Sequence, residues 1–167
     1  MPSPAAPSRA LVAPAALMAV ILIGATALAC GSDSPVTPKP PTFVATLNGS
    51  SEVPAKAVAG TGSATIVKAG GVYTYTVTYS GLTGAPIASH IHAPGNSGVS
   101  VGVLVPFTLP SGLGTSGTFT GTFTSTNNAA ISTDSLDVLM ANGNAYVNIH
   151  STANTGGEIR GQLSRQP

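Results

Sequence analysis

The sequence predicts an all-β protein, built from about eight short antiparallel strands and one short helix that form a sandwich or barrel. Three observations lead to this class. Only 7% of the residues are charged, and Gly and Pro occur 20 and 14 times, a composition that disfavours a helical bundle. Apolar and polar residues alternate with a period of two over several stretches. Clusters of Gly, Pro, Ser and Asn separate these stretches and predict hairpins and loops.

The alternation begins at Thr42 and is clearest at residues 72–80, "VYTYTVTYS", where Tyr and Val alternate with Thr and Ser. β-Branched and aromatic residues at this spacing are typical of half-buried antiparallel strands with one face in the core. The side chains that the alternation places in the core are Phe43, Ala45, Leu47, Ala64, Ile66, Tyr73, Tyr75, Val77, Tyr79, Val99, Val101, Val103, Val105, Phe119 and Phe123. Breaks rich in glycine at 68–71, 94–98 and 110–117 predict the turns and loops between the strands.

One segment, "STDSLDVLMANG", departs from this alternation and predicts a short helix. Its apolar residues at helical spacing are Leu136, Leu139 and Met140. Ser132 or Thr133 can cap the start of the helix, and Gly143 can end it. Two further strands are predicted after the helix, at 145–151 and 158–164.

The beginning of the chain predicts an export signal. Arg9 is followed by the apolar run "ALVAPAALMAVILIGATALA" and then by Cys30, the single cysteine of the chain. A positive start, an apolar middle and a small-residue exit are typical of such signals. The segment "ALAC" resembles the lipobox of bacterial lipoproteins, which implies cleavage before Cys30 and a lipid on its sulfur. A transmembrane anchor or ordinary secretion is the alternative, because about 20 apolar residues can span a bilayer.

This interpretation divides the chain into a lipoprotein-type signal peptide (1–29), a Pro-rich tether (30–41) and one β domain (42–167). Removal of 1–29 takes away Arg9, one of six basic residues, and leaves five basic and five acidic residues, so the remainder is formally neutral. Such a domain lacks the basic surface that nucleic-acid binding requires. We therefore expect a lipid-anchored protein of the bacterial cell envelope, at the outer membrane or cell surface, and no nucleic-acid partner.

Three blocks of the β domain carry a family resemblance: "NGSSEVPA", "YSGLTGAPIASHIHAPG" and "GNAYVNIHSTANTGGEIRGQL". In this order and spacing they resemble the CHRD domain, which is common in bacterial exported proteins, and the resemblance covers about residues 42 to 164. It implies an immunoglobulin-like Greek-key β-barrel with a limited similarity to copper,zinc superoxide dismutase. It implies no established biochemical activity.

The three histidines of the chain lie in predicted strands. His90 and His92 are two residues apart, so they share a face, while Ile91 points to the opposite face. In a later strand, His150 lies on the same face as Asn148 and opposite to the apolar residues. If the apolar faces fill the core, all three histidines lie on the outer surface of the barrel.

A His-x-His strand and a later histidine resemble the arrangement that supplies copper ligands in the dismutases. The resemblance implies that His90, His92 and His150 bind copper or zinc, metals that neutral imidazole suits. The bridging histidine, the zinc-site histidines and the disulfide cysteines have no counterparts in this chain. Superoxide dismutase activity is therefore not expected.

The alternative to a metal site is a hydrogen-bonded network of the histidines with Tyr146 and Asn148, which share their face. The sequence leaves both interpretations open. Glu52, Glu158 and Arg160 are three of the few ionised groups, and each lies in a family block. They predict either an ion pair between Arg160 and a carboxylate that fixes loops, or a carboxylate that orients a histidine.

The sequence contains no nucleophile elbow, Walker loop or dinucleotide fingerprint, so an enzyme is not the expected class. The favoured function is that of an exported, membrane-anchored CHRD binding module without established catalytic activity. Lipid on Cys30 holds it at the membrane in this hypothesis, and its partner is an unknown protein or surface polymer. The alternative is a copper- or zinc-binding protein that uses the three histidines.

Overall fold

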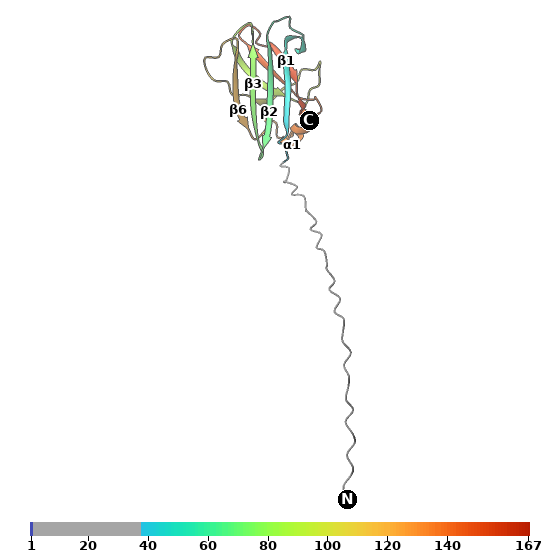
Figure 1. Ribbon diagram of the computed structural model, residues 1–167. Coiled ribbons are helices and arrows are strands. Elements are labelled where there is room, and N and C mark those ends of the chain that lie inside the picture. Colours follow the sequence, from blue (N-terminus) through green and yellow to red (C-terminus); the bar gives the residue numbers. More distant parts are fainter. Residues whose placement is uncertain (2–37) are drawn as a thin grey trace, which may run out of the picture. The chain divides into compact units, whose positions relative to one another are not determined.

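The computed structural model describes residues 38–167 and Met1 (Figure 1). Residues 2–37 hold almost all of the predicted signal peptide, Cys30 and most of the tether, and these predictions lie outside the described residues. In the part that is described, no helix has the length and apolar character needed to cross a membrane.

The domain consists of nine strands, one α-helix and one short 3-10 helix. In chain order they are β1 (Thr42–Asn48), η1 (Gly49–Ser51), β2 (Thr61–Ala69), β3 (Val72–Ser80), β4 (Pro86–His92), β5 (Val103–Pro106), β6 (Gly117–Phe123), α1 (Thr133–Ala141), β7 (Tyr146–Ser151), β8 (Ile159–Gln162) and β9 (Ser164–Arg165). The predicted all-β class with one short helix is therefore confirmed.

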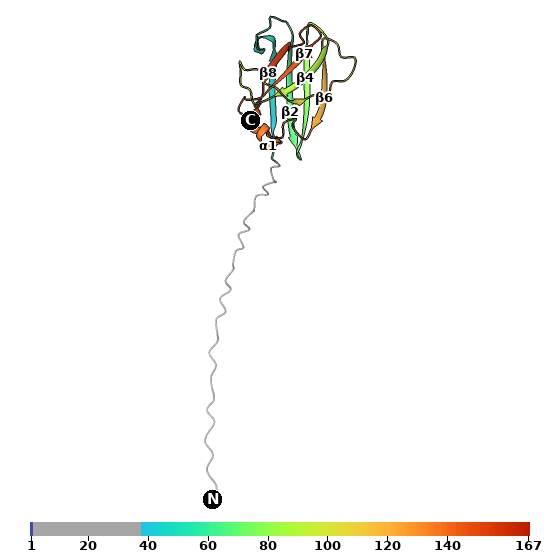
Figure 2. The ribbon, with the colours of Figure 1, turned by 180° about the vertical axis from the view of Figure 1, so that it is seen from behind.

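All strands belong to one antiparallel sheet, in the order β5-β4-β7-β8-β1-β2-β3-β6, with the short β9 paired to β1. The sheet curls into a nearly closed barrel. Figure 1 shows β1, β2, β3 and β6 on one side, and Figure 2 shows β4, β7 and β8 on the other. The strands β4 and β7 carry the three predicted histidines, and β8 carries Arg160.

The core lies between the two sides of the curled sheet. The alternation in β1, β2, β3 and β6 is confirmed: Phe119 and its predicted partners are buried, and Phe123 packs against the core from a half-buried position. Two glycines of β6 leave room for the large rings of β3, because Tyr75 pairs with Gly121 and Tyr79 with Gly117. A Cβ at either glycine would meet the tyrosine across from it.

Helix α1 closes the end of the barrel where β1 begins (Figure 1). The side chain of Ser132 accepts a hydrogen bond from the backbone N–H of Ser135 and caps the helix. Of the two predicted capping residues, Ser132 and Thr133, the first is therefore the cap. Two of the three predicted apolar residues, Leu136 and Met140, are fully buried. Gly143 follows the last turn with a φ of 70°, a conformation that glycine adopts without strain.

The predicted strand "VSVGVLVPF", residues 99–107, is wrong in extent and in the direction of most of its side chains. Only β5 forms, and Val99 and Val103 are 45% and 44% exposed, whereas Leu104 and Val105 are buried. A register shift in the pairing of β4 with β5 places consecutive residues, rather than alternate ones, in the core. The preceding segment, residues 93–102, is a loop that crosses the outer face of the sheet, and we call it the covering loop.

Candidate metal centre

Strand pairing brings the three histidines together on the outer face. His90 pairs with Asn148 across β4 and β7, and His92 pairs with Tyr146. His150 lies further along β7, opposite Ala88. The inward-facing Ile91, like the apolar residues of β7, is fully buried, so the predicted division between apolar inner and polar outer faces holds.

The imidazole rings lie close enough to share one ion. The ring centroids are 5.4 Å apart for His90 and His92, 5.0 Å for His90 and His150, and 6.5 Å for His92 and His150. One ring nitrogen from each histidine can be chosen so that the three atoms lie within 4.8 Å of one another. At metal–nitrogen distances of about 2.0–2.1 Å, tetrahedral ligands are about 3.4 Å apart, so closure onto an ion requires shifts on the order of an ångström.

Backbone carbonyls fix the tautomers of two of these rings. The Nδ1 atom of His92 lies 2.8 Å from the carbonyl oxygen of Val101, and Nδ1 of His150 lies 2.8 Å from that of Thr155. A carbonyl oxygen only accepts, so each Nδ1 carries the hydrogen and each neutral ring keeps a lone pair on Nε2. This is the arrangement in which metal-binding histidines are commonly held.

Two ring nitrogens of this histidine group are buried without a hydrogen bond. Nε2 of His150 and Nδ1 of His90 have no partner anywhere in residues 38–167. Burial, together with the neighbouring His150 and His92, lowers the pKa of His90 from 6.5 to about 4. Burial also lowers the pKa of His92. Both rings are therefore neutral at neutral pH, the state in which imidazole binds a metal.

The predicted position of the histidines on the outer surface needs one correction. They lie on the outer face of the sheet, but His92 is only 7% exposed because the covering loop lies over it. Backbone N–H of Val101 in this loop also donates to the hydroxyl of Tyr146. The side-chain amide of Gln162 donates to the carbonyl of Gly95 and thereby holds the other end of the loop.

Arg160 holds the covering loop from below. Its side chain is 1% exposed, and Nη2 donates to the carbonyl oxygens of Asn96 and Val99 and to the side chain of Gln162. The guanidinium also lies 3.4 Å from the ring centroid of Tyr146. The ring of Tyr146 also stacks in parallel on the ring of His92, with the two centroids 4.7 Å apart.

The two predicted carboxylates act differently from expectation. No ion pair joins Arg160 to Glu52 or Glu158 in the described domain, and no carboxylate contacts a histidine, since carbonyls occupy those positions. Glu52 is near enough for Arg160 to lower its pKa, but burial outweighs this effect and raises the pKa to about 6.

Glu158 fixes a different loop. Its carboxylate is fully buried and accepts a hydrogen bond from the backbone N–H of Thr83. Burial raises the pKa of Glu158, but hydrogen bonds from Ser151, Thr83 and Asn154 outweigh burial and leave the pKa lowered. Glu158 is therefore an ionised structural group beside the histidine cluster and not part of it.

Residues that sequence reasoning missed are those of the covering loop and Gln162. Val101, Asn96 and Val99 contribute only backbone groups, so their side chains gave no signal. The "EIRGQL" block did contain Gln162 at the position two residues after Arg160, on the same face of β8. That spacing was the one available signal for its role.

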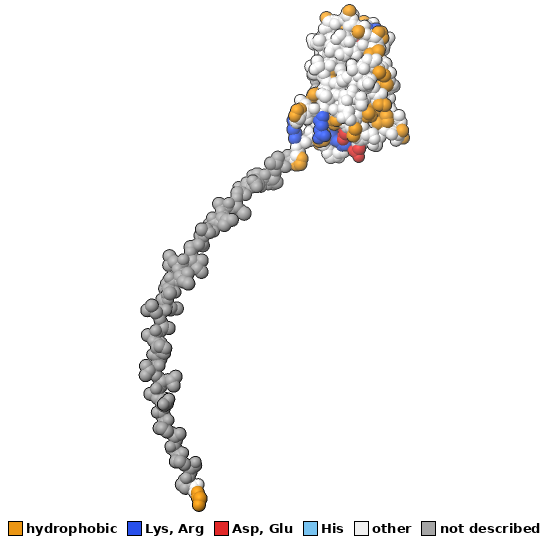
Figure 3. Space-filling model, turned by 90° about the vertical axis from the view of Figure 1, so that its right-hand side faces the viewer, with side chains coloured by type: hydrophobic (Ala, Val, Ile, Leu, Met, Phe, Trp, Pro, Cys, Tyr) orange, Lys and Arg blue, Asp and Glu red, His pale blue; other side chains and the backbone are white. Residues whose placement is uncertain are grey.

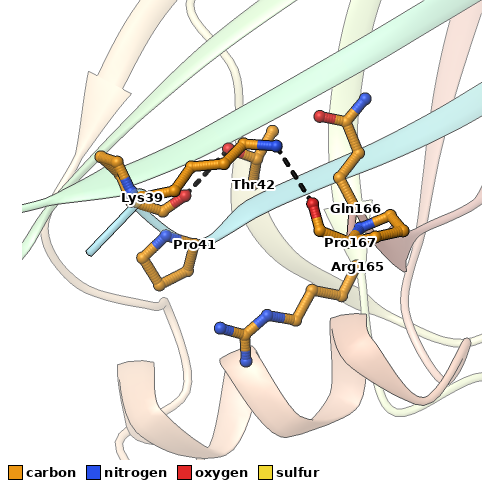
Figure 4. Close-up of a pocket in the computed structure, with 7 residues that line it drawn as sticks. Lys39, Pro41, Thr42, Arg165, Gln166 and Pro167 are labelled. Carbon is orange, nitrogen blue, oxygen red and sulfur yellow. Dashed lines mark hydrogen bonds between the residues drawn. The ribbon is translucent and has the colours of Figure 1, made fainter. Parts of the chain in front are cut away.

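The other polar features of the domain lie elsewhere. On the face shown in Figure 3, most charged side chains gather at the end of the domain that carries α1, where Lys68 contacts Asp134 and Asp137 at 3.1 and 2.6 Å. A pocket of about 330 Å³ is formed by the two ends of the described domain. Figure 4 shows Lys39 donating to the carbonyl oxygen of Pro167 in this pocket, with Arg165 directed away from that bond. None of the predicted site residues lines it.

The fold and the polar outer face define an all-β domain in which three widely separated sequence blocks meet at one site. The family model of the CHRD domain matches residues 43–163, and the chain belongs to this family. The match confirms the resemblance and its extent. No match was found among curated proteins, and none among solved structures.

Proposed function

We propose that this protein is an exported, lipid-anchored CHRD module that binds one transition-metal ion, copper or zinc, through His90, His92 and His150. The observation that carries the proposal is the convergence of three imidazole nitrogens within 4.8 Å, two of them on rings whose tautomer is fixed by a carbonyl. Nδ1 of His90 and Nε2 of His150 are buried without a partner among residues 38–167, and an ion bound through these atoms would give each of them one.

The chemistry of the three groups favours copper or zinc over calcium or magnesium. Imidazole nitrogen suits copper and zinc, whereas calcium and magnesium prefer oxygen ligands. The group contains three histidines and no carboxylate or thiolate. Three protein ligands leave a coordination position open to water or to a small ligand. The chain's own residues supply binding and orientation, and we assign the module no catalytic step.

Attachment to a membrane is proposed from the sequence alone. Cys30 follows an apolar run in the pattern of a lipobox, and residues 31–41 supply a Pro-rich spacer to β1. Metabolic labelling with a fatty acid in a bacterial host tests this point. Labelled protein is expected in the membrane fraction, and Cys30→Ala is expected to abolish the label; equal labelling of both would contradict the lipid anchor.

Metal binding is tested by calorimetric titration of the full mature protein, purified in detergent, with Zn(II) and Cu(II). One ion per chain is expected, and His90→Gln or His150→Gln is expected to weaken binding at least tenfold. Thr78→Ala, on the exposed face of β3, is the control and is expected to bind like the wild type. Equal, weak binding by all four proteins would leave the histidines as a structural network and overturn the proposal.

A further inference from the structure

The side chain of Asn148 lies in the middle of the candidate metal centre. It comes from β7, between His90 on β4 and Arg160 on β8 in the strand register, and is 4% exposed. Its amide oxygen, Oδ1, lies 3.1 Å from Nε2 of His92, one of the nitrogens proposed to bind the ion. A buried amide at hydrogen-bond distance from a ligand atom affects whether that atom is available to a metal.

The direction of this hydrogen bond follows from the other nitrogen of the ring. Nδ1 of His92 donates to the carbonyl oxygen of Val101, so Nε2 of the neutral ring can only accept. The oxygen and nitrogen of an amide have the same shape and are assigned from their hydrogen bonds. Two acceptors cannot bond to each other, so we turn the amide of Asn148 by 180° and assign its NH2 group, in place of Oδ1, to the position beside Nε2. The lone pair that a metal needs from His92 is therefore occupied by Asn148.

The three candidate ligands differ in this respect. Nδ1 of His90 and Nε2 of His150 are buried with no partner in the described domain, whereas Nε2 of His92 has the amide of Asn148 beside it. The ring of His92 is also fixed by its stack on Tyr146 and by its bond to Val101. It would keep its position if the bond to Asn148 were lost.

We infer that Asn148 is a positioning residue that competes with the metal: it holds Nε2 of His92 in the metal-free protein and must release it when the ion binds. This inference rests on the proposed metal-binding function. The competition weakens binding by the strength of one net hydrogen bond and makes the ion easier to exchange. A net hydrogen bond of typical strength changes an equilibrium by roughly 2- to 13-fold.

The test compares Zn(II) affinities of the wild type, Asn148→Leu and Asn148→Ala by competition with a chromophoric chelator. Leucine keeps the volume of the buried side chain and removes the donor, so it remains informative if the alanine variant fails to fold. Both variants are expected to bind Zn(II) roughly 2- to 13-fold more tightly than the wild type. Asn127→Ala, on an exposed loop, is the control and is expected to bind like the wild type.

Nitrogen NMR of the metal-free protein gives a second readout that a merely structural residue would not move. In Asn148→Leu the Nε2 resonance of His92 is expected to move toward the shift of an unprotonated nitrogen that accepts no hydrogen bond. Nδ1 is expected to remain protonated. An unchanged chemical shift of Nε2 would overturn the inference. Asn148 variants whose affinity for Zn(II) is equal to or lower than that of the wild type would also overturn it.

The two proposals fail in different ways. Equal affinities of wild type and Asn148 variants, abolished in each by His150→Gln, would overturn the role of Asn148 and leave the metal centre standing. Binding by the Asn148 variants alone would support the competition and contradict metal binding by the natural protein. Absence of binding in every protein would overturn both.

Discussion

Replacement of Arg160 by methionine tests how far the outer face of β4, β7 and β8 depends on one buried cation. Methionine keeps much of the side-chain volume and removes the charge and all donors. The change leaves the carbonyls of Asn96 and Val99 without the donors that now hold the covering loop. It also removes the cation from the ring of Tyr146 and takes away the larger of the two positive charges that lower the pKa of Glu52.

The expected cost is about 3–5 kcal/mol of unfolding free energy. Arg160 makes no ion pair within the described domain, so this cost comes mainly from its hydrogen bonds to the carbonyl oxygens of Asn96 and Val99. Lost charge-assisted hydrogen bonds cost about 1.5–3 kcal/mol each, although such terms do not add fully. A domain with a total stability of about 5–15 kcal/mol would lose a large fraction of it.

The assay is urea unfolding followed by far-UV circular dichroism, because the chain has no tryptophan. Arg165→Met, at an exposed position, is the matched control and should stay within about 0.5 kcal/mol of the wild type. The double variant with Glu52→Gln should lose less than the sum of the single changes, since the neutral amide that replaces the carboxylate leaves no buried charge unpaired. A loss below about 1 kcal/mol for Arg160→Met, or strict additivity with Glu52→Gln, would refute this reasoning.

Three further predictions concern single positions. Folding lowers the pKa of His90 from 6.5 to about 4, so in the metal-free protein the unfolded state binds a proton more readily than the folded state. The free energy of unfolding is therefore unaffected by His90 above pH 6.5 and decreases as the pH falls toward 4. His90→Gln should reduce the slope of unfolding free energy against pH in this range by up to about 1.4 kcal/mol per pH unit. Equal slopes for the wild type and His90→Gln in chelator-treated samples would contradict the role of His90. Gly161→Ala should lower the free energy of unfolding in urea by about 1–3 kcal/mol, because a Cβ there clashes with the carbonyl of Thr46. Gly102→Ala is the control and should leave stability unchanged, because a Cβ there meets nothing within 4 Å. Equal effects of the two changes would disprove the steric argument. Ser132→Ala removes the cap of α1 and should cost about 1 kcal/mol in thermal unfolding, and an unchanged midpoint would show that the cap is unimportant.

The sequence predicted the strands of the barrel because their alternation is itself the physical cause of the fold. Tyr73, Tyr75 and Tyr79 alternate with threonines, and no other arrangement buries those rings while leaving the threonines in water. The same reasoning placed His90 and His92 on the face opposite Ile91. Local pattern was sufficient wherever a strand has one buried and one polar face.

The covering loop could not be predicted in this way. Its path depends on Arg160 and Gln162, which lie more than 60 residues later in the chain. Its own sequence, "APGNSGVSVG", alternates enough to resemble a strand, yet its backbone carbonyls bond to side chains instead of to a neighbouring strand. The tautomer of His92 depends on the same loop and was equally hidden.

The buried polar atoms that lack a hydrogen-bond partner in the described domain all lie in the three sequence blocks that resemble the CHRD family. Five buried side-chain atoms lack a hydrogen-bond partner within residues 38–167, and all belong to residues of those blocks: Glu52, His90, His150, Glu158 and Arg160. Each such atom costs about 1–3 kcal/mol, and the barrel has a continuous apolar core that does not need them. Such atoms in native proteins are explained by strain, by a catalytic role, or by a bound water or ion. Two of the five atoms, on His90 and His150, belong to the three converging imidazoles, and this is the point of the outer face at which we propose that a metal binds.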